Sequence, residues 1–517
     1  LTIRNELQPT LSEVQTNSIV FINDPILVTG SDFLLGGNEG TTVAVIDGCF
    51  DQGSTGDCVD IAPIEVPIVP ESQFERSRGT FAFAPTIAGI RPGQFRGRVF
   101  LRNRHGGGDS DNESDALPAN YEMIAPDIFK TSPREASLGQ YVIVEGGGFV
   151  GQVPGATTTL RVSGEFTRTG EQVGAPVPEL ILVPEFVAGD QVRYVLSEDD
   201  TLGQSVNLRQ ETGSFIGTMT PIITFGSDQV VGEASFLSFD VASVKQVVYL
   251  DFRISYVESL RKFGLRAVDS LIRERVVENI RRDFAGINLE VRTEPPEDYA
   301  LFSTVEIAGP DLNGLGLLGY DSSTGKDNGN QRLYDYIGGV NALVQQDGFP
   351  GYGGVFIEFL LGFSRDPAGV AESLPGADER FDSIFDSFRP ERGGSRVVAN
   401  DLVGGVPKLS NADICPARDR QEQIACAVWV LGSLIATTVS HQLGHSLGLA
   451  NPGGVEVHNP GDLDNRLMDA SDKRPFVERA ELDGFGPAVF CDAEYEYLRT
   501  ILPSRQPADP RPRPSCL

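Results

Sequence analysis

Three histidines near the C-terminal end of the chain are the residues best suited to chemistry. His441 and His445 stand four positions apart, and His458 follows them. On a helix this spacing brings two side chains to the same face, because a turn takes 3.6 residues. Two imidazoles placed in this way can bind one metal ion together. The alternative is that both are ordinary helix histidines that bind nothing.

The sequence around this pair carries a longer pattern. The stretch HQLGHSLGLAN runs from His441 to Asn451, and NRLMDA surrounds Met468. The pattern resembles the metzincin zinc-peptidase signature HExxHxxGxx(H/D), in which a methionine turn lies beneath the metal. The resemblance implies a metzincin-like α+β domain over residues 244–503, with zinc as its cofactor. It implies that His441 and His445 bind zinc and that Met468 forms the methionine turn.

Two positions depart from that signature. Gln442 occupies the place of the glutamate that serves the family as general base, and an amide cannot take up a proton. Such proton transfer contributes about 10²–10⁴-fold to a rate. Asn451 occupies the place of the third ligand, where an amide oxygen binds zinc poorly, and His458 could replace it. Because of these changes, zinc binding itself is open.

These departures predict an extracellular pseudopeptidase, catalytically inactive, with a structural, adhesive or self-assembling role. The alternative is a secreted zinc metalloendopeptidase with impaired or unusual catalysis, so whether the chain is an enzyme stays open. In either case the expected partner is a protein or peptide, including other copies of the same chain.

The first 240 residues have an all-β pattern. Short runs of Val, Ile, Thr and Phe alternate with Gly and Pro turn signals. We expect two similar β-sandwiches, at residues 1–125 and 126–243. Three pairs of residues recur at one constant offset and indicate an internal repeat. These pairs are Phe33 and Phe149, Gly48 and Gly164, and Phe50 and Phe166.

The second repeat opens with IFKTSPREASLG from Ile128 and YVIVEGGGF from Tyr141. These segments resemble the opening of TIG/IPT domains, which are immunoglobulin-like sandwiches and usually act as spacers or adhesion modules. The expected fold class is therefore multidomain, with two all-β immunoglobulin-like sandwiches followed by an α+β metzincin-like domain. Residues 504–517 form a Pro-rich C-terminal tail that should be extended.

The C-terminal half changes from the all-β pattern to a mixed one. Apolar spacing in residues 267–284 is typical of a helix. The other elements expected are strands at 247–252, 288–292, 303–307 and 353–361, and helices at 421–449 and 492–501.

The six cysteines are an even number, and none is in a CxxC pair. Close spacing predicts disulfides Cys49–Cys58 and Cys415–Cys426, and elimination leaves Cys491–Cys516. Disulfides place the protein outside the cytosol, so we expect an extracellular or bacterial cell-surface location. The alternative is six buried free thiols.

The charge balance excludes several partners. The chain has 42 Lys and Arg against 72 Asp and Glu, which gives a net charge of −30. Nucleic acids and anionic membranes both require clustered positive charge, so neither is an expected partner. No apolar run is long enough for a transmembrane helix; the longest, at 426–439, is too short.

A second metal is suggested by oxygen-bearing side chains in a Gly-rich stretch. Asp311, Asn313, Asp321 and Asp327 lie there together in sequence. Carboxylate and amide oxygens are ligands of Ca²⁺, so calcium is a candidate cofactor. The spacing differs from that of an EF-hand, and solvated turns account for the same residues.

Overall fold

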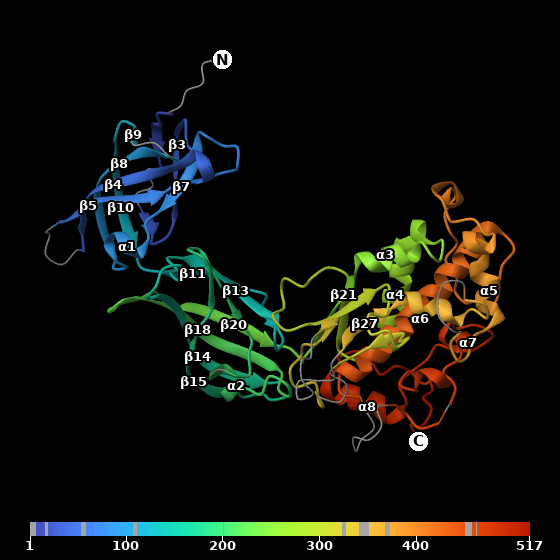
Figure 1. The fold of residues 1–517 in the computed structure, drawn as a ribbon. Helices are drawn as coiled ribbons and strands as arrows, with labels where there is room; N and C mark the ends of the chain where they lie inside the picture. The colour runs from blue at the N-terminus through green and yellow to red at the C-terminus, as the bar shows by residue number, and fades with distance from the viewer. Residues whose placement is uncertain are drawn as a thin grey trace, which may run out of the picture. The chain divides into compact units, whose positions relative to one another are not determined.

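The structure is a computed structural model of the whole chain. The chain forms two compact units, residues 1–242 and 243–517 (Figure 1). The structure describes residues 7–15, 19–52, 58–106, 111–199, 201–322, 327–340, 351–367, 373–449, 458–461 and 463–516. The side chains of residues 111 and 201 are not described.

The first unit contains two β-sandwiches. In the first sandwich one sheet has the order β1-β3-β7-β6, and the other has the order β2-β10-β8-β4-β5, with β9 beside β8. Its elements are β1 Thr10–Val14, β2 Ile19–Phe21, β3 Pro25–Ser31, β4 Gly40–Asp51, β5 Val59–Pro67, β6 Val69–Pro70, β7 Arg78–Ala82, α1 Pro85–Ala88, β8 Gly93–His105, β9 Asp111–Glu113 and β10 Leu117–Ile124.

The second sandwich repeats this topology strand for strand. Its sheets have the orders β11-β13-β17-β16 and β12-β20-β18-β14-β15, with β19 beside β18. Its elements are β11 Asp127–Ser132, β12 Glu135–Ala136, β13 Tyr141–Gly147, β14 Ala156–Arg168, β15 Ala175–Leu182, β16 Glu185–Ala188, β17 Gln191–Val195, α2 Thr201–Ser205, β18 Gly213–Phe225, β19 Asp228–Val231 and β20 Ser235–Val241. The internal repeat expected from the sequence is thus present.

A glycine pair marks the same place in both sandwiches. Gly48 on β4 faces Gly97 on β8, and a Cβ atom on Gly48 would lie 2.4 Å from a backbone oxygen of the neighbouring strand. Gly164 on β14 faces Gly217 on β18, and a Cβ atom on Gly164 would lie 2.3 Å from the corresponding oxygen. Both sites need glycine because the strands approach too closely for a side chain.

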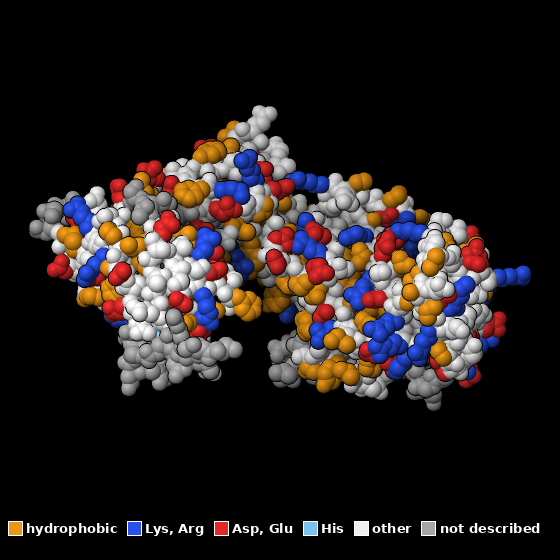
Figure 2. Space-filling model, turned by 90° about the horizontal axis from the view of Figure 1, so that it is seen from above, with side chains coloured by type: hydrophobic (Ala, Val, Ile, Leu, Met, Phe, Trp, Pro, Cys, Tyr) orange, Lys and Arg blue, Asp and Glu red, His pale blue; other side chains and the backbone are white. Residues whose placement is uncertain are grey.

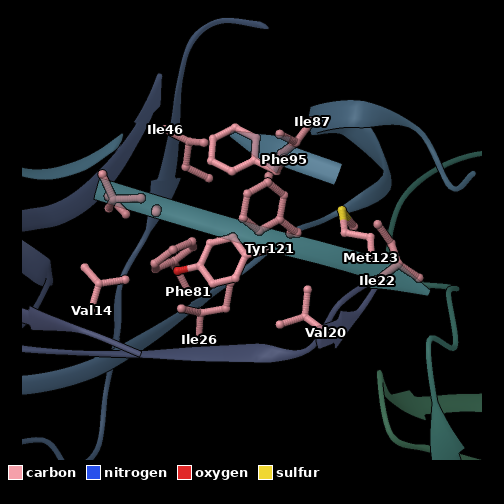
Figure 3. Close-up of a cluster of buried hydrophobic side chains, with 14 of the residues drawn as sticks. Val14, Val20, Ile22, Ile26, Ile46, Phe81, Ile87, Phe95, Tyr121 and Met123 are labelled. Carbon is pink, nitrogen blue, oxygen red and sulfur yellow. The ribbon is translucent and has the colours of Figure 1, made fainter. Parts of the chain in front are cut away.

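Aromatic rings fill the core of the first sandwich. Phe83 lies 5.0 Å from Phe95 and 5.6 Å from Tyr121, measured between ring centroids. Figure 3 shows Phe81, Phe95 and Tyr121 among the aliphatic side chains of this core. Such edge-to-face ring pairs add about 0.5–1.5 kcal/mol each beyond the apolar area that they bury.

The core of the second sandwich holds a cavity of about 60 Å³ that only apolar and aromatic residues line. One of its lining residues, Leu196, has a counterpart in the repeat. Asn23 N donates to Phe83 O in the first sandwich, and Gly139 N donates to Leu196 O at the matching place in the second. The second sandwich therefore has a leucine beside the cavity where the first sandwich has a ring.

The second unit is built on a mixed sheet with the order β22-β21-β23-β27-β24. Strand β21 pairs in parallel with β22 and with β23. Strand β23 also pairs in parallel with β25 and β27. The short strands β24 and β26 are antiparallel to β27. The strands are β21 Gln246–Phe252, β22 Leu289–Arg292, β23 Ser303–Ala308, β24 Gly319–Tyr320, β25 Tyr336–Ile337, β26 Gly339–Val340 and β27 Tyr352–Phe356. The α-helices are α3 Ile254–Leu260, α4 Asp269–Asp283, α5 Glu379–Phe385, α6 Arg420–Ser446, α7 Phe476–Arg479 and α8 Asp492–Ile501.

The expected strand at 353–361 is partly wrong. β27 ends at Phe356, and a 3₁₀ helix, Ile357–Phe363, follows directly. The run is apolar because both the strand and the 3₁₀ helix are buried. A continuous apolar run does not by itself distinguish a strand from a short buried helix.

Helix α6 is the central element of this unit. Asp419 begins it by accepting hydrogen bonds from the backbone N–H groups of Gln421 and Glu422. The helix has 27 residues and is long and apolar enough to cross a membrane by length and composition, but 94% of its most apolar window is buried inside the structure. A helix that is apolar on all sides is expected when it lies in a protein core.

Polar contacts fix α6 against α4. Ser440 Oγ donates to Asp283 Oδ2 at 2.9 Å, and Asn279 Nδ2 donates to Ser433 Oγ at 3.0 Å. Arg275 and Arg282, both on α4, each form an ion pair with Glu481. These contacts set the position of α6 along its axis and around it.

The fold class is confirmed only in its coarser part: the chain is multidomain and rich in β-sheet. The metzincin-like α+β domain expected over residues 244–503 is not supported. The residue that would distinguish it, a glutamate after the first helix histidine, is absent, because Gln442 stands there.

The structure contains the disulfides Cys49–Cys58, Cys415–Cys426 and Cys491–Cys516. The third joins the start of α8 to the C-terminal tail. Acidic and basic side chains are interspersed over the face shown in Figure 2.

Candidate metal centre

Three histidine side chains meet in the second unit. His441 and His445 come from α6, and His458 comes from the described segment 458–461. One ring nitrogen of each lies within 4.8 Å of the other two. The ring centroid of His458 is 5.2 Å from that of His441 and 5.2 Å from that of His445. The structure thus brings together three of the four residues that the sequence suggested as metal ligands; the fourth, Asn451, lies outside the described residues.

Backbone carbonyls orient the two helix histidines. His441 Nδ1 lies 2.7 Å from Leu467 O, and His445 Nδ1 lies 3.0 Å from Leu449 O. A carbonyl oxygen only accepts hydrogen bonds, so each Nδ1 carries the proton and donates it. Each Nε2 atom therefore keeps its lone pair. A hydrogen bond from the other ring nitrogen to a carbonyl oxygen fixes the tautomer and the orientation in which a histidine binds a metal.

The end of α6 places one of those carbonyls. Gly448 has a φ of +91°. Its N–H donates to His445 O, and Leu449 N–H donates to Gly444 O. These two bonds form a Schellman motif, in which a left-handed glycine ends the helix. The chain turns sharply there, and Leu449 O comes back to face the ring of His445.

The Nε2 atoms of His441 and His445 face each other at 3.1 Å. With both protons on Nδ1, two lone pairs point at one another, which is unfavourable unless a cation lies between them. Two nitrogen ligands on one tetrahedral zinc ion lie about 3.3 Å apart, because each Zn–N bond is about 2.0–2.1 Å. The observed separation therefore suits a shared metal ion.

The electrostatics keep all three rings neutral. Burial lowers the pKa of His441 well below its usual value, and the nearby His445 and His458 lower it further. Burial lowers the pKa of His445 to about 4 and also lowers the pKa of His458. Only a neutral imidazole binds a metal, so the site is ready to bind at neutral pH.

Met468 lies directly beneath this part of α6. A Cβ atom on Gly444 would lie 2.4 Å from Met468 Sδ and 3.3 Å from a ring carbon of Phe490. Because Gly444 has no side chain, the helix backbone can lie against the thioether of Met468. Met468 is thus placed close to the histidine pair, although its nearest neighbour here is the helix backbone.

Gln442 is buried on the same helix. A Cβ atom on Gly319 of β24 would lie 3.0 Å from Gln442 Nε2, so the side chain packs against that edge strand. Its amide does not take up a proton near neutral pH, so its chemistry excludes a role as general base.

The residues suggested for calcium are engaged with their own loops. Asp311 accepts hydrogen bonds from the N–H groups of Asn313, Leu315 and Leu317. Asp327 accepts from the N–H groups of Gln331 and Arg332. Among the described residues, no cluster of three or more ligand-bearing side chains includes Asp311, Asp321 or Asp327. Calcium at these positions stays a prediction.

Buried charges support the site, and sequence reasoning did not identify them. Arg474 is buried and donates to Leu467 O, the carbonyl that also holds His441, and to Thr437 Oγ1 on α6. Arg466 is fully buried beside Asp469, with 2.8 Å between Nε and Oδ1. The only sequence signal was the position of these charges next to Met468.

Comparisons with protein-family models and with curated proteins give no match. Among solved structures, SGBP-B from a complex xyloglucan utilization locus in Bacteroides uniformis is similar over 44% of this chain and 49% of that chain. The sequence identity is 14% and the TM-score is 0.16. A crystal structure with xylogluco-oligosaccharide is similar over 45% of this chain and 40% of that chain, with 13% identity and a TM-score of 0.14. Such low values give no basis for assigning xyloglucan binding to this chain.

These findings correct the metzincin and TIG/IPT assignment made from the sequence. No family model supports it, and the HExxH motif is incomplete, because Gln442 stands in the place of the glutamate. The pseudopeptidase and the metalloendopeptidase functions are therefore wrong. The expectation of a protein or peptide partner has no support either.

Proposed function

We propose that the second unit binds one zinc ion through the Nε2 atoms of His441 and His445 and through His458. The observation that carries this proposal is the 3.1 Å distance between His441 Nε2 and His445 Nε2, with a backbone carbonyl at each Nδ1 atom. Three imidazoles leave one position of a tetrahedral zinc ion for a further ligand.

The nature of the ligands favours zinc among the biological cations. Imidazole nitrogen suits zinc, copper, nickel and iron, whereas calcium and magnesium prefer oxygen. A cluster that contains only histidines excludes the oxygen-seeking ions. The rings are neutral and buried, so the site does not require the metal to change its oxidation state.

The protein acts outside the cytosol in this proposal, at a bacterial surface or in the surrounding medium. Three disulfides support that location, since thiols stay reduced in most cytosols. Zinc is available there without competition from the cytosolic thiol pool.

Metal analysis tests the proposal. The full chain is purified without added metal, stripped with a chelator and titrated with Zn²⁺, and bound metal is measured by elemental mass spectrometry. We expect about one zinc per chain, falling to near zero in His441→Ala. The matched control is His105→Ala, which removes the one histidine that lies outside this cluster. Equal zinc content in the wild type and in His441→Ala would overturn the proposal.

A further inference from the structure

The third histidine lies on segment 458–461, which is held by hydrogen bonds to other parts of the second unit. Segment 458–461 follows residues that the structure does not describe, and it contains no helix. Its contacts include a hydrogen bond from Asn459 Nδ2 to Cys491 Sγ at 3.9 Å and two further hydrogen bonds. Asn459 N donates to Met468 O at 3.1 Å, and Arg466 Nη2 donates to Pro460 O at 2.6 Å.

Arg466 in turn depends on the C-terminal tail. Its side chain is fully buried, and it is paired with Asp469. Its Nη1 atom donates to the carbonyl oxygens of Ser515 and Cys516, at 3.3 and 3.4 Å. The last described residues of the chain thus accept hydrogen bonds from the guanidinium group that holds Pro460.

The disulfide Cys491–Cys516 keeps the tail in that position. Cys491 precedes α8, and the tail also returns to this helix start, because Asp492 N donates to Pro514 O at 3.1 Å. Arg513 adds a cation–π contact, with its guanidinium carbon 3.3 Å from the centroid of the Tyr495 ring. The tail is therefore fastened both covalently and by packing.

We infer that Arg466 and the C-terminal disulfide are positioning elements that hold His458 toward His441 and His445, so that the tail completes the zinc site. This inference rests on the proposed function. None of these elements contacts the metal; they act through His458 alone. Loss of the hydrogen bonds that orient a ligating histidine typically weakens metal binding by about 10–100-fold, and we expect a loss of that order when His458 is no longer held.

The first experiment removes the disulfide from the full chain. Zinc affinity is measured by competition with a chelating dye in Cys491→Ser/Cys516→Ser. We expect a loss of about 10–100-fold. The matched control, Cys49→Ser/Cys58→Ser, breaks a disulfide in the first unit and should leave zinc affinity unchanged. Equal affinity in the wild type and in Cys491→Ser/Cys516→Ser would overturn the inference.

A second experiment separates positioning from general destabilisation. In a His458→Ala background the disulfide substitution should cause no further loss of affinity, because its effect passes through that ring. Co²⁺ absorption gives an independent readout: the disulfide variant should show the spectrum of His458→Ala rather than that of the wild type. Additive losses would overturn the inference.

If Cys491→Ser/Cys516→Ser does not fold, Arg466→Lys tests the same inference with the disulfide intact. Lysine keeps the charge beside Asp469 but cannot reach Pro460 and the tail together. It should lower zinc affinity to the level of His458→Ala, and unchanged affinity would contradict the inference. If the wild type itself binds no zinc, the proposed function fails, which is distinct from failure of the positioning role alone.

Discussion

Gly444 and Met468 are in such close contact that a single added carbon at position 444 would lie 2.4 Å from the methionine sulfur. At this point the helix contributes no side chain, so its backbone lies directly against the Met468 side chain of the segment that carries Leu467 O. The distance from His441 to Leu467 O depends on that close approach.

Gly444→Ala should therefore move α6 away from its support. We expect a loss of about 1–3 kcal/mol in the free energy of unfolding, as is typical of overpacked cores, together with weaker zinc binding. Chemical denaturation measures the first quantity. Met468→Ala removes the clashing sulfur, so the penalty of Gly444→Ala should be smaller in that background. An equal penalty in both backgrounds would show that the contact is not the cause.

The stability of the metal-free protein should depend on histidine protonation. Burial holds the pKa of His445 at about 4 in the folded state, against about 6.5 when exposed. The unfolded chain therefore takes up a proton first as the pH falls. The stabilising contribution is complete above about pH 6.5 and is lost as the pH falls toward 4. Urea unfolding across this range should show a shallower decline in His445→Gln than in the wild type; parallel declines would contradict the assignment.

The cavity in the second sandwich should accept a ring. Leu196→Phe places at this site the side chain that the first sandwich has at Phe83, and we expect a gain of about 0.5–2 kcal/mol in the stability of the first unit. The reciprocal change, Phe83→Leu, should cost about 1–2 kcal/mol, because it removes ring atoms from a buried core and leaves a void behind. Calorimetry of the full chain would follow both transitions. A destabilised Leu196→Phe variant would mean that the cavity does not have the shape of a ring.

Glu481 should be among the most sensitive charged residues of the second unit. Its carboxylate pairs with Arg275 and Arg282, and its side chain is only 10% exposed. Glu481→Gln leaves the largely buried Arg275 without its paired carboxylate and leaves Arg282 with Asp283 alone; removal of one partner of a buried pair costs about 3–5 kcal/mol. Glu179→Gln is the matched control, because its pair with Arg161 is exposed and 3.9 Å long. Similar unfolding midpoints for both variants would disprove the role of Glu481.

The sequence predicted local elements well where periodicity was strong. Helix α8 and strands β22 and β23 lie where alternation and helical spacing place them, and the constant offset of Phe33 and Phe149 corresponds to a real repeat of topology. The end of β27 was missed, because a buried 3₁₀ helix has the same apolar composition as a buried strand.

The candidate site was only partly visible in the sequence. The spacing of His441 and His445 predicted a shared metal ion directly, because helical geometry is local. The place of His458 depends on Arg466 and on the far end of the chain, which no local pattern reveals. The motif resemblance misled on function, because a motif match does not show that the chemistry is retained when its carboxylate is replaced by Gln442.

The duplicated sandwiches bear on how this chain reaches its native state. Neighbouring domains of one topology are prone to exchange strands during folding. Here the two copies differ in core volume, with the ring of Phe83 in one and the smaller Leu196 in the other. Leu196 carried into the first sandwich would leave a void where the ring of Phe83 packs against Phe95 and Tyr121. An exchange of strands between the two copies would therefore lose ring contacts of the first core, so the divergence of the copies disfavours such mispairing within one chain.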